Sequence, residues 1–138
     1  MSQENVEIAR RWNAAYNRRD MEALFALTAS DFEFRSIFLT IESIFRGHEG
    51  LDAYFEAIED AYERFVVLAD DFIDAGAAVL LVANVKWRGK ESGAEGTMPL
   101  LVAAWLRAGE VFRIETFTDR TEALKAVGLS EQDVHADS

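Results

Sequence analysis

The chain has 138 residues, of which 50% are hydrophobic and 12% aromatic, a composition that suits one domain with its own core and excludes a disordered chain. Its net charge of −11 opposes binding to nucleic acid and to anionic lipid, so we expect neither nucleic acid nor a membrane as partner. The absence of cysteine excludes disulfides and thiolate metal sites.

The start of the chain predicts two paired helices. Residues 1–11 mix acidic and basic side chains and lack the apolar centre of a signal peptide, so we expect a cytoplasmic protein. An amphipathic helix over residues 3–18 is predicted from residues at helical spacing, namely Ile8, Trp12, Ala15 and Tyr16. A second, shorter helix capped by Asp20 follows, and its shared face holds Met21, Leu24, Phe25 and Thr28.

The next segment predicts a strand and a third helix. Phe32 and Phe34 alternate with charged residues, which predicts a half-buried strand over residues 31–35. Residues 36–46 fit either another strand or a loop that ends at Gly47. After a break at residues 47–50, apolar residues at helical offsets predict a helix of about four turns that begins at Leu51, with Leu51, Tyr54, Phe55, Ile58 and Tyr62 on its packed face.

The second half predicts an antiparallel meander and a short final helix. Apolar runs between turn residues predict strands over residues 65–73, 77–87, 97–106 and 111–118. Two of these runs are apolar on both faces, so we expect helices over one face of the sheet and a second subunit over the other. Asp119 and Glu122 have capping-box spacing before a helix over residues 120–127. We expect one domain over residues 1–129 and a polar, disordered tail over residues 130–138.

Three strings in the sequence fit one known family. They are AAYNRRD at residues 14–20, RGHEGL at residues 46–51 and FTDRTEAL at residues 117–124. With the order of predicted elements, they resemble the SnoaL-like polyketide cyclases of the nuclear transport factor two-like superfamily over residues 3–129. The resemblance implies an α+β fold whose curved antiparallel sheet forms a cone, with three helices from the N-terminal half over its concave face and a short C-terminal helix. It also implies a pocket under the first and third helices and a homodimer formed through the sheet.

The resemblance further implies a reaction without a cofactor. Cyclases of this type use a carboxylate on the late strands to remove a proton next to a carbonyl, often with a histidine close by. The two histidines of this chain lie elsewhere, His48 in a turn and His135 in the tail, and isolated histidines predict no metal site. The superfamily also contains isomerases, dehydratases, epoxide hydrolases and non-catalytic binding domains, so the fold alone does not fix the reaction.

Three residues are candidates for catalysis. Tyr16 is a candidate hydrogen-bond donor to a developing oxyanion, or else an ordinary core aromatic. Asp119 either reaches the rim of the pocket or caps the final helix. Glu115 is the candidate base if its face of the strand lines the pocket; otherwise it pairs on the outer face with a strand arginine, Arg88, Arg107 or Arg113.

The candidate substrate-binding residues are large apolar side chains and two arginines. Arginine can hold an anionic or carbonyl group through paired hydrogen bonds, but on half-buried strands it more often pairs with acids. An epoxide-hydrolase arrangement would combine Glu115 with Glu33 and an arginine. The sequence does not fix which of these side chains face the pocket, because a one-residue shift in strand register reverses them. The set is Trp12, Phe34, Phe38, Tyr54, Arg88, Met98, Trp105 and Arg113.

Two kinds of function therefore stay open. The first is a cofactor-independent acid–base enzyme of the cyclase or isomerase type that acts on a small hydrophobic carbonyl compound. The second is a non-catalytic dimer that binds a small hydrophobic molecule or has a structural role, and it predicts a closed, apolar pocket. A carboxylate that points into the pocket would favour the first function over the second.

Overall fold

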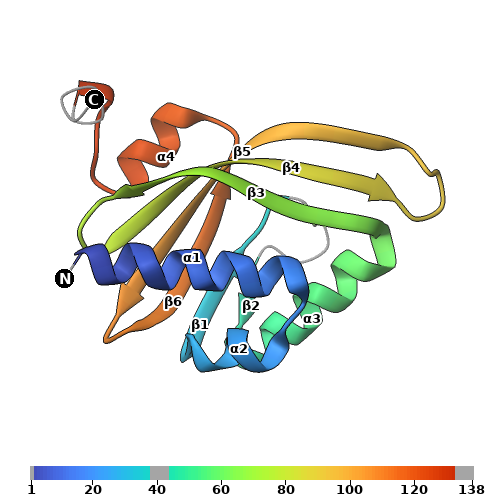
Figure 1. The fold of residues 1–138 in the computed structure, drawn as a ribbon, viewed down its shortest axis with the longest axis horizontal. Coiled ribbons are helices and arrows are strands. Elements are labelled where there is room, and N and C mark those ends of the chain that lie inside the picture. Colours follow the sequence, from blue (N-terminus) through green and yellow to red (C-terminus); the bar gives the residue numbers. More distant parts are fainter. Residues whose placement is uncertain (1, 38–43, 133–138) are drawn as a thin grey trace.

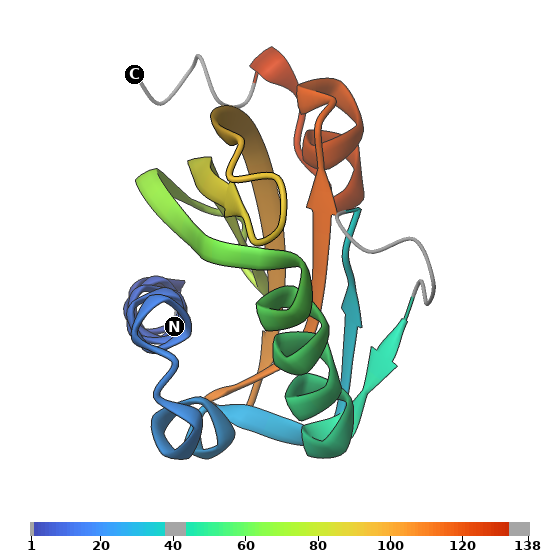
Figure 2. The ribbon, with the colours of Figure 1, turned by 90° about the vertical axis from the view of Figure 1, so that its right-hand side faces the viewer.

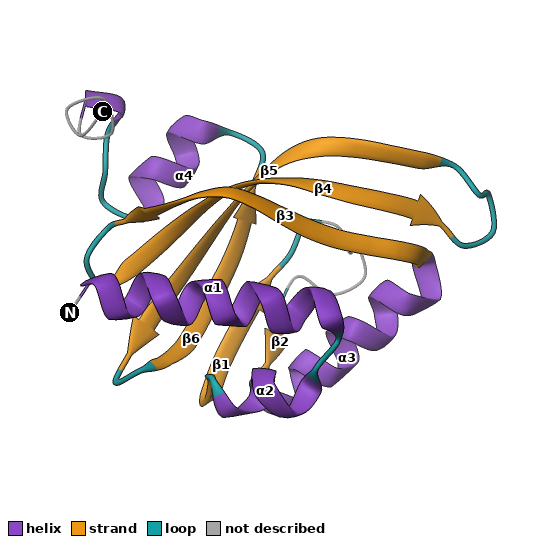
Figure 3. Cartoon of the chain, viewed as in Figure 1, coloured by secondary structure: helices purple, strands orange, loops and turns teal. Residues whose placement is uncertain are grey.

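The computed structural model describes residues 2–37 and 44–132, which form four helices and six strands (Figures 1 and 3). The elements in chain order are α1 (Ser2–Arg18), α2 (Met21–Ala26), β1 (Thr28–Arg35), β2 (Phe45–Arg46), α3 (Gly47–Ala61), β3 (Tyr62–Asp74), β4 (Ala78–Gly89), β5 (Glu95–Arg107), β6 (Glu110–Phe117) and α4 (Arg120–Ala126). None of the described helices is long and apolar enough to cross a membrane.

The strands form one curved sheet in the order β2-β1-β6-β5-β4-β3. The predicted α+β class and the meander from β3 to β6 are confirmed. One strand pair departs from the antiparallel expectation, because β1 runs parallel to β6, with Phe34 opposite Ile114. The reason is topological: the chain returns to β1 only after β2, α3 and three further strands, so no hairpin fixes the relative direction of this pair.

Helices lie on both faces of the sheet. Figure 2, viewed along α1, shows the sheet bent around α1 and α3, with α4 on the other side. The main core fills the concave side and contains the aromatic residues of α1, α3 and β1. A second, smaller core lies under α4, where Leu124 packs with Leu80 and Ala103 of the convex face. This second core explains why β4 and β5 are apolar on both faces.

The junction of α2 and β1 differs from the sequence prediction. Asp20 caps α2 as expected, accepting a hydrogen bond from Ala23 N at 3.2 Å. The helix ends at Ala26, however, so the placement of Thr28 on its face was wrong; Thr28 begins β1 and is 1% exposed. Its hydroxyl donates to the carbonyl of Leu24 at 2.5 Å, which ties the first residue of the strand to the last turn of the helix.

The third helix begins four residues earlier than predicted, at Gly47 instead of Leu51. The backbone at Gly47 is left-handed, with φ of +69°, a conformation that glycine adopts without strain. A β-carbon at Gly50 would lie 2.7 Å from the carbonyl carbon of Phe45, so a larger residue there would push the helix off β2. The two glycines therefore set the position from which α3 extends Tyr54 over the sheet.

Candidate functional site

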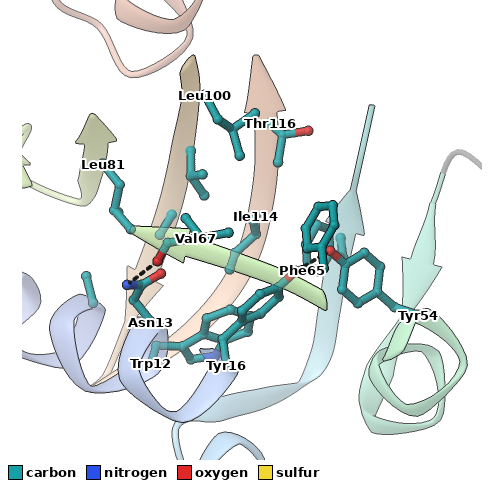
Figure 4. A pocket seen from close by; sticks show the side chains of 14 residues that line it. Trp12, Asn13, Tyr16, Tyr54, Phe65, Val67, Leu81, Leu100, Ile114 and Thr116 are labelled. Atoms are coloured by element: carbon teal, nitrogen blue, oxygen red, sulfur yellow. Dashed lines mark hydrogen bonds between the residues drawn. The ribbon is translucent and has the colours of Figure 1, made fainter. Parts of the chain in front are cut away.

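A narrow cavity lies between α1, α3 and the concave face of the sheet (Figure 4). Its volume is about 30 Å³, and its wall combines aromatic rings with aliphatic strand residues. The aromatic part of the wall consists of Trp12, Tyr16, Phe34, Tyr54 and Phe65. A cavity of this size holds a guest on the scale of a water molecule, so a ring-sized guest requires wall side chains to move.

Helical and strand periodicity place the wall residues. On α1, Ala9, Trp12, Asn13 and Tyr16 are spaced by three and four residues, so they share the face that covers the cavity. On β6, Ile114 and Thr116 alternate with outward residues, and β5 contributes Leu100, Val102 and Ala104 by the same period of two. These strands therefore present mainly aliphatic side chains to the cavity.

The phenols of Tyr16 and Tyr54 meet in the wall of the cavity, where their hydroxyl oxygens lie 2.6 Å apart. Burial raises the pKa of Tyr16 to about 12, against smaller opposing effects of the hydrogen bond with Tyr54 and the charge of Arg19. Burial also raises the pKa of Tyr54 well above its ordinary value. Both phenols are therefore protonated at physiological pH and can act as hydrogen-bond donors.

A buried hydrogen-bond chain holds the indole of Trp12 in the wall. Trp12 Nε1 donates to Thr28 Oγ1 at 2.9 Å, and this hydroxyl donates in turn to the carbonyl of Leu24. The carbonyl of Thr28 is 2.9 Å from Nε2 of His48, whose ring stacks on Phe25. Because the indole N–H is satisfied inside the protein, Trp12 presents only apolar ring surface to the cavity.

Two asparagines of α1 bind the main chain of β3, which is one of the two edge strands of the sheet. Asn17 makes two hydrogen bonds with Val67, donating to its carbonyl at 2.8 Å and accepting from its N–H at 2.9 Å. Asn13 donates to the same carbonyl at 3.2 Å, and it also lines the cavity. Side chains of α1 thus take the place of a neighbouring strand along this stretch of the edge.

The structure brings four of the predicted site residues together in the cavity wall: Trp12, Tyr16, Phe34 and Tyr54. Met98 lies on the same face of the sheet, where it packs at the edge of the main core instead of in the wall. Phe38 lies outside the described residues. A cavity with an aromatic wall therefore lies under α1 and α3, where the family resemblance implied a pocket.

Of the two positions considered for Glu115, the structure has the one on the outer face, paired with an arginine. Because Ile114 and Thr116 face the cavity, Glu115 and Arg113 face the convex side, where their side chains form an ion pair at 3.0 Å. Trp105 lies on that side too, with the guanidinium of Arg113 4.8 Å from the centre of its ring. The same period of two that puts aliphatic residues in the cavity thus excludes all three of these candidates from it. Pairing of two copies through this outer face stays a prediction.

The remaining two candidates also lie away from the cavity. Asp119 accepts a hydrogen bond from Glu122 N at 3.2 Å and caps α4, the alternative role considered for it. Arg88 is near the exposed end of β4 and forms ion pairs with Glu63 at 2.9 Å and Glu95 at 3.1 Å. Neither residue contributes to the cavity wall: Arg88 lies at the end of β4, and Asp119 lies directly before the first turn of α4.

Several wall residues were not predicted from the sequence. Asn13 is the main one, because a polar residue next to the apolar stripe of α1 looks like part of the solvent-facing side. Phe65 and Val67 were placed on a strand without an assigned face. Helical spacing alone offered a signal, since Asn13 lies four residues after Ala9 and three before Tyr16.

The polar groups of the wall are neutral. Asn13, Tyr16, Tyr54 and Thr116 are its polar side chains, and no acidic, basic or histidine side chain of the described residues contributes to it. The described part of the chain also contains no group of three metal-ligating side chains. The cavity can therefore donate and accept hydrogen bonds, but it presents no general base of ordinary strength.

Comparisons with known proteins agree with this architecture. Residues 9–115 match the family model of the SnoaL-like domain. An NTF2-like protein from Burkholderia xenovorans is 27% identical, with a TM-score of 0.74 over 92% of this chain and 97% of that one. A proposed polyketide cyclase from Xanthomonas campestris pv. campestris is 19% identical, with a TM-score of 0.70 over 92% and 98% of the two chains. TerC, co-crystallised with polyporic acid, is 17% identical, with a TM-score of 0.76 over 90% and 98%. A comparison with curated proteins finds no match.

Proposed function

The chain belongs to the SnoaL-like domain family, and from this premise we propose that it binds a small, uncharged, mainly apolar molecule in the concave cavity. The observation that carries the proposal is the pair of protonated phenols, Tyr16 and Tyr54, in a wall that is otherwise almost wholly apolar. Such a wall binds an apolar body, and a phenol in it donates a hydrogen bond to one oxygen of the guest.

The phenol pair leaves one hydroxyl proton for a guest. Either hydroxyl can donate in the hydrogen bond that joins Tyr16 and Tyr54, and this bond uses one of the two protons. The side chain of Ser36 hydrogen-bonds to Tyr54 and lowers its pKa. The natural acceptor for the second phenol proton is a carbonyl oxygen.

The same wall argues against the acid–base reaction predicted from the sequence. That reaction needs a base within hydrogen-bond reach of an acidic carbon. Glu115 and Asp119 lie elsewhere, and the described wall residues include no other carboxylate or imidazole. Binding without carboxylate catalysis is therefore favoured over a cyclase, an isomerase or a two-carboxylate epoxide hydrolase.

The size of the cavity limits the guest. A volume of about 30 Å³ is well below the ~150 Å³ of an engineered cavity that admits benzene. A one-ring guest thus binds only to a conformation in which the wall has opened, and the cost of opening lowers the apparent affinity. We therefore expect weak binding of single-ring compounds and exclusion of larger ring systems.

The test is calorimetric titration with acetophenone and ethylbenzene, which differ in the carbonyl group. The unchanged protein should prefer acetophenone by about fivefold, the worth of one hydrogen bond of about 1 kcal/mol. The double variant Tyr16→Phe/Tyr54→Phe keeps the shape of the wall and should lose this preference, while Tyr62→Phe, outside the cavity, should keep it. Equal affinities in the unchanged protein, or a preference that survives the double variant, would refute the proposal.

A further inference from the structure

We infer that Asn13 is a specificity-determining residue of the cavity, which accepts a hydrogen bond from a donor group on the guest. The inference rests on the proposed function and narrows the class of guest. A molecule held by both the Tyr16–Tyr54 pair and Asn13 carries a carbonyl acceptor on one side and a hydroxyl or amine donor on the other. The simplest such class is the single-ring hydroxyaryl carbonyl compounds.

The comparison with Asn17 shows that the edge of β3 does not need Asn13. Asn17 alone satisfies both polar groups of Val67, its N–H and its carbonyl. Asn13 adds only a second, longer hydrogen bond to a carbonyl that already has a donor. The hydrogen bond to Val67 therefore does not by itself explain why an asparagine lies at this position of an apolar wall.

The bond to Val67 also fixes how the Asn13 amide is turned. Its nitrogen must face the carbonyl, because only the nitrogen can donate. Its oxygen has no hydrogen-bond donor among residues 2–37 and 44–132 that the structure records, whereas the oxygen of Asn17 accepts from Val67 N. Asn13 thus offers the cavity an oriented acceptor that is already held in place.

The acceptor and the phenol donor lie on different sides of the cavity. Figure 4 shows Asn13 beside the main chain of Val67, and Tyr16 extending away from α1 to meet Tyr54 of α3. The aliphatic residues Leu81 and Ile114 also line the cavity, and in this view Ile114 lies between Asn13 and Tyr54. A flat ring with polar groups on opposite carbons matches this order of donor, apolar wall and acceptor.

The experiment compares three probes: acetophenone, para-hydroxyacetophenone and para-methoxyacetophenone. The unchanged protein should bind the hydroxy compound about fivefold more tightly than the methoxy compound, which lacks the donor. Asn13→Leu should abolish this ratio, and the matched control Asn17→Leu, which loses bonds to the same Val67, should retain it. If Asn13→Leu does not fold, Asn13→Ala serves for the same comparison.

The outcomes separate this inference from the proposed function. A hydroxyl preference that persists in the Asn13 variant, or no hydroxyl preference in the unchanged protein, would overturn the role of Asn13. In both cases a carbonyl preference that depends on the two tyrosines would leave the proposed function standing. Failure of all three probes to bind would overturn both.

Discussion

The hydroxyl oxygens of Tyr16 and Tyr54 lie 2.6 Å apart although 38 residues separate them along the chain. They meet because α1 and α3 cross the same concave face, each with its apolar side towards the sheet. The pair is a polar feature of a mainly apolar interior, and both phenols are held in the neutral form by burial. A neutral donor inside an aromatic wall is suited to recognising an oxygen on an apolar guest.

The raised pKa of Tyr16 predicts a loss of stability at alkaline pH. The folded-state pKa of about 12 exceeds the ordinary value of 10.0. The contribution of Tyr16 to the free energy of unfolding is therefore fully present below about pH 10 and is lost as pH rises towards about 12. Two pKa units correspond to roughly 3 kcal/mol. Urea unfolding from neutral pH to about pH 12 measures this loss of stability. In the variant Tyr16→Phe/Tyr54→Phe in a Tyr62→Phe background, the free energy of unfolding should fall less steeply with pH. An equally steep curve in that variant would contradict the assignment.

Thr28→Val should destabilise the protein by about 1–3 kcal/mol, because it leaves the indole N–H of Trp12 buried without an acceptor. Thr28→Ser keeps the hydroxyl, so it should lower the free energy of unfolding markedly less. Urea unfolding followed by circular dichroism gives the free energies, and the fluorescence of Trp12 in a Trp87→Phe/Trp105→Phe background reports the indole environment. Equal stability of the valine and serine variants would show that this bond contributes nothing.

Leu81→Ala should enlarge the cavity at an apolar point of its wall. The cost is about 2–5 kcal/mol of stability, and the new space should raise the affinity for acetophenone because less of the wall must open. The matched control is Leu68→Ala on the exposed part of β3, which should change stability by less than about 0.5 kcal/mol and leave affinity unchanged. A lower affinity in Leu81→Ala would indicate that the guest binds elsewhere.

Gly96→Ala should clash with Trp87. A β-carbon at Gly96 would lie 2.6 Å from Cζ2 of that indole, and the indole must move away from residue 96 to relieve this overlap. Overpacking of this kind costs about 1–3 kcal/mol. In the double variant Gly96→Ala/Trp87→Leu the alanine should be tolerated better than beside tryptophan, and thermal unfolding of the four proteins in the cycle measures the difference. If the stability losses of the two single variants simply add in the double variant, the clash with Trp87 is not the cause of the loss in Gly96→Ala.

Glu115→Gln should leave the affinity for acetophenone unchanged, because Glu115 pairs with Arg113 on the convex face. The partly exposed ion pair contributes at most about 1 kcal/mol to stability. Calorimetric titration of the variant tests this directly. An affinity change of tenfold or more would return Glu115 to the list of site residues.

Four of the five aromatic wall residues, all but Phe65, could be predicted from the sequence, and the facing of the polar candidates on the strands could not. Trp12 and Tyr16 recur at helical spacing, so their shared inner face followed from α1 alone. Strand parity grouped Glu115 with Arg113, but it could not decide which face of β6 is inward. That decision depends on α4, whose Leu124 creates a second apolar core on the convex side. Asn13 was missed because its role depends on the main chain of β3, far away in sequence.

The central claim is that a small guest occupies the concave cavity, and methyl NMR tests it most directly. Leu80 and Leu81 are neighbours on β4 that face opposite sides of the sheet, Leu81 in the cavity wall and Leu80 in the core under α4. Saturating acetophenone should shift the methyl signals of Leu81 and Ile114 and leave those of Leu80 nearly unchanged. A response confined to Leu80, or no response of Leu81 and Ile114 while the guest is bound, would contradict the account.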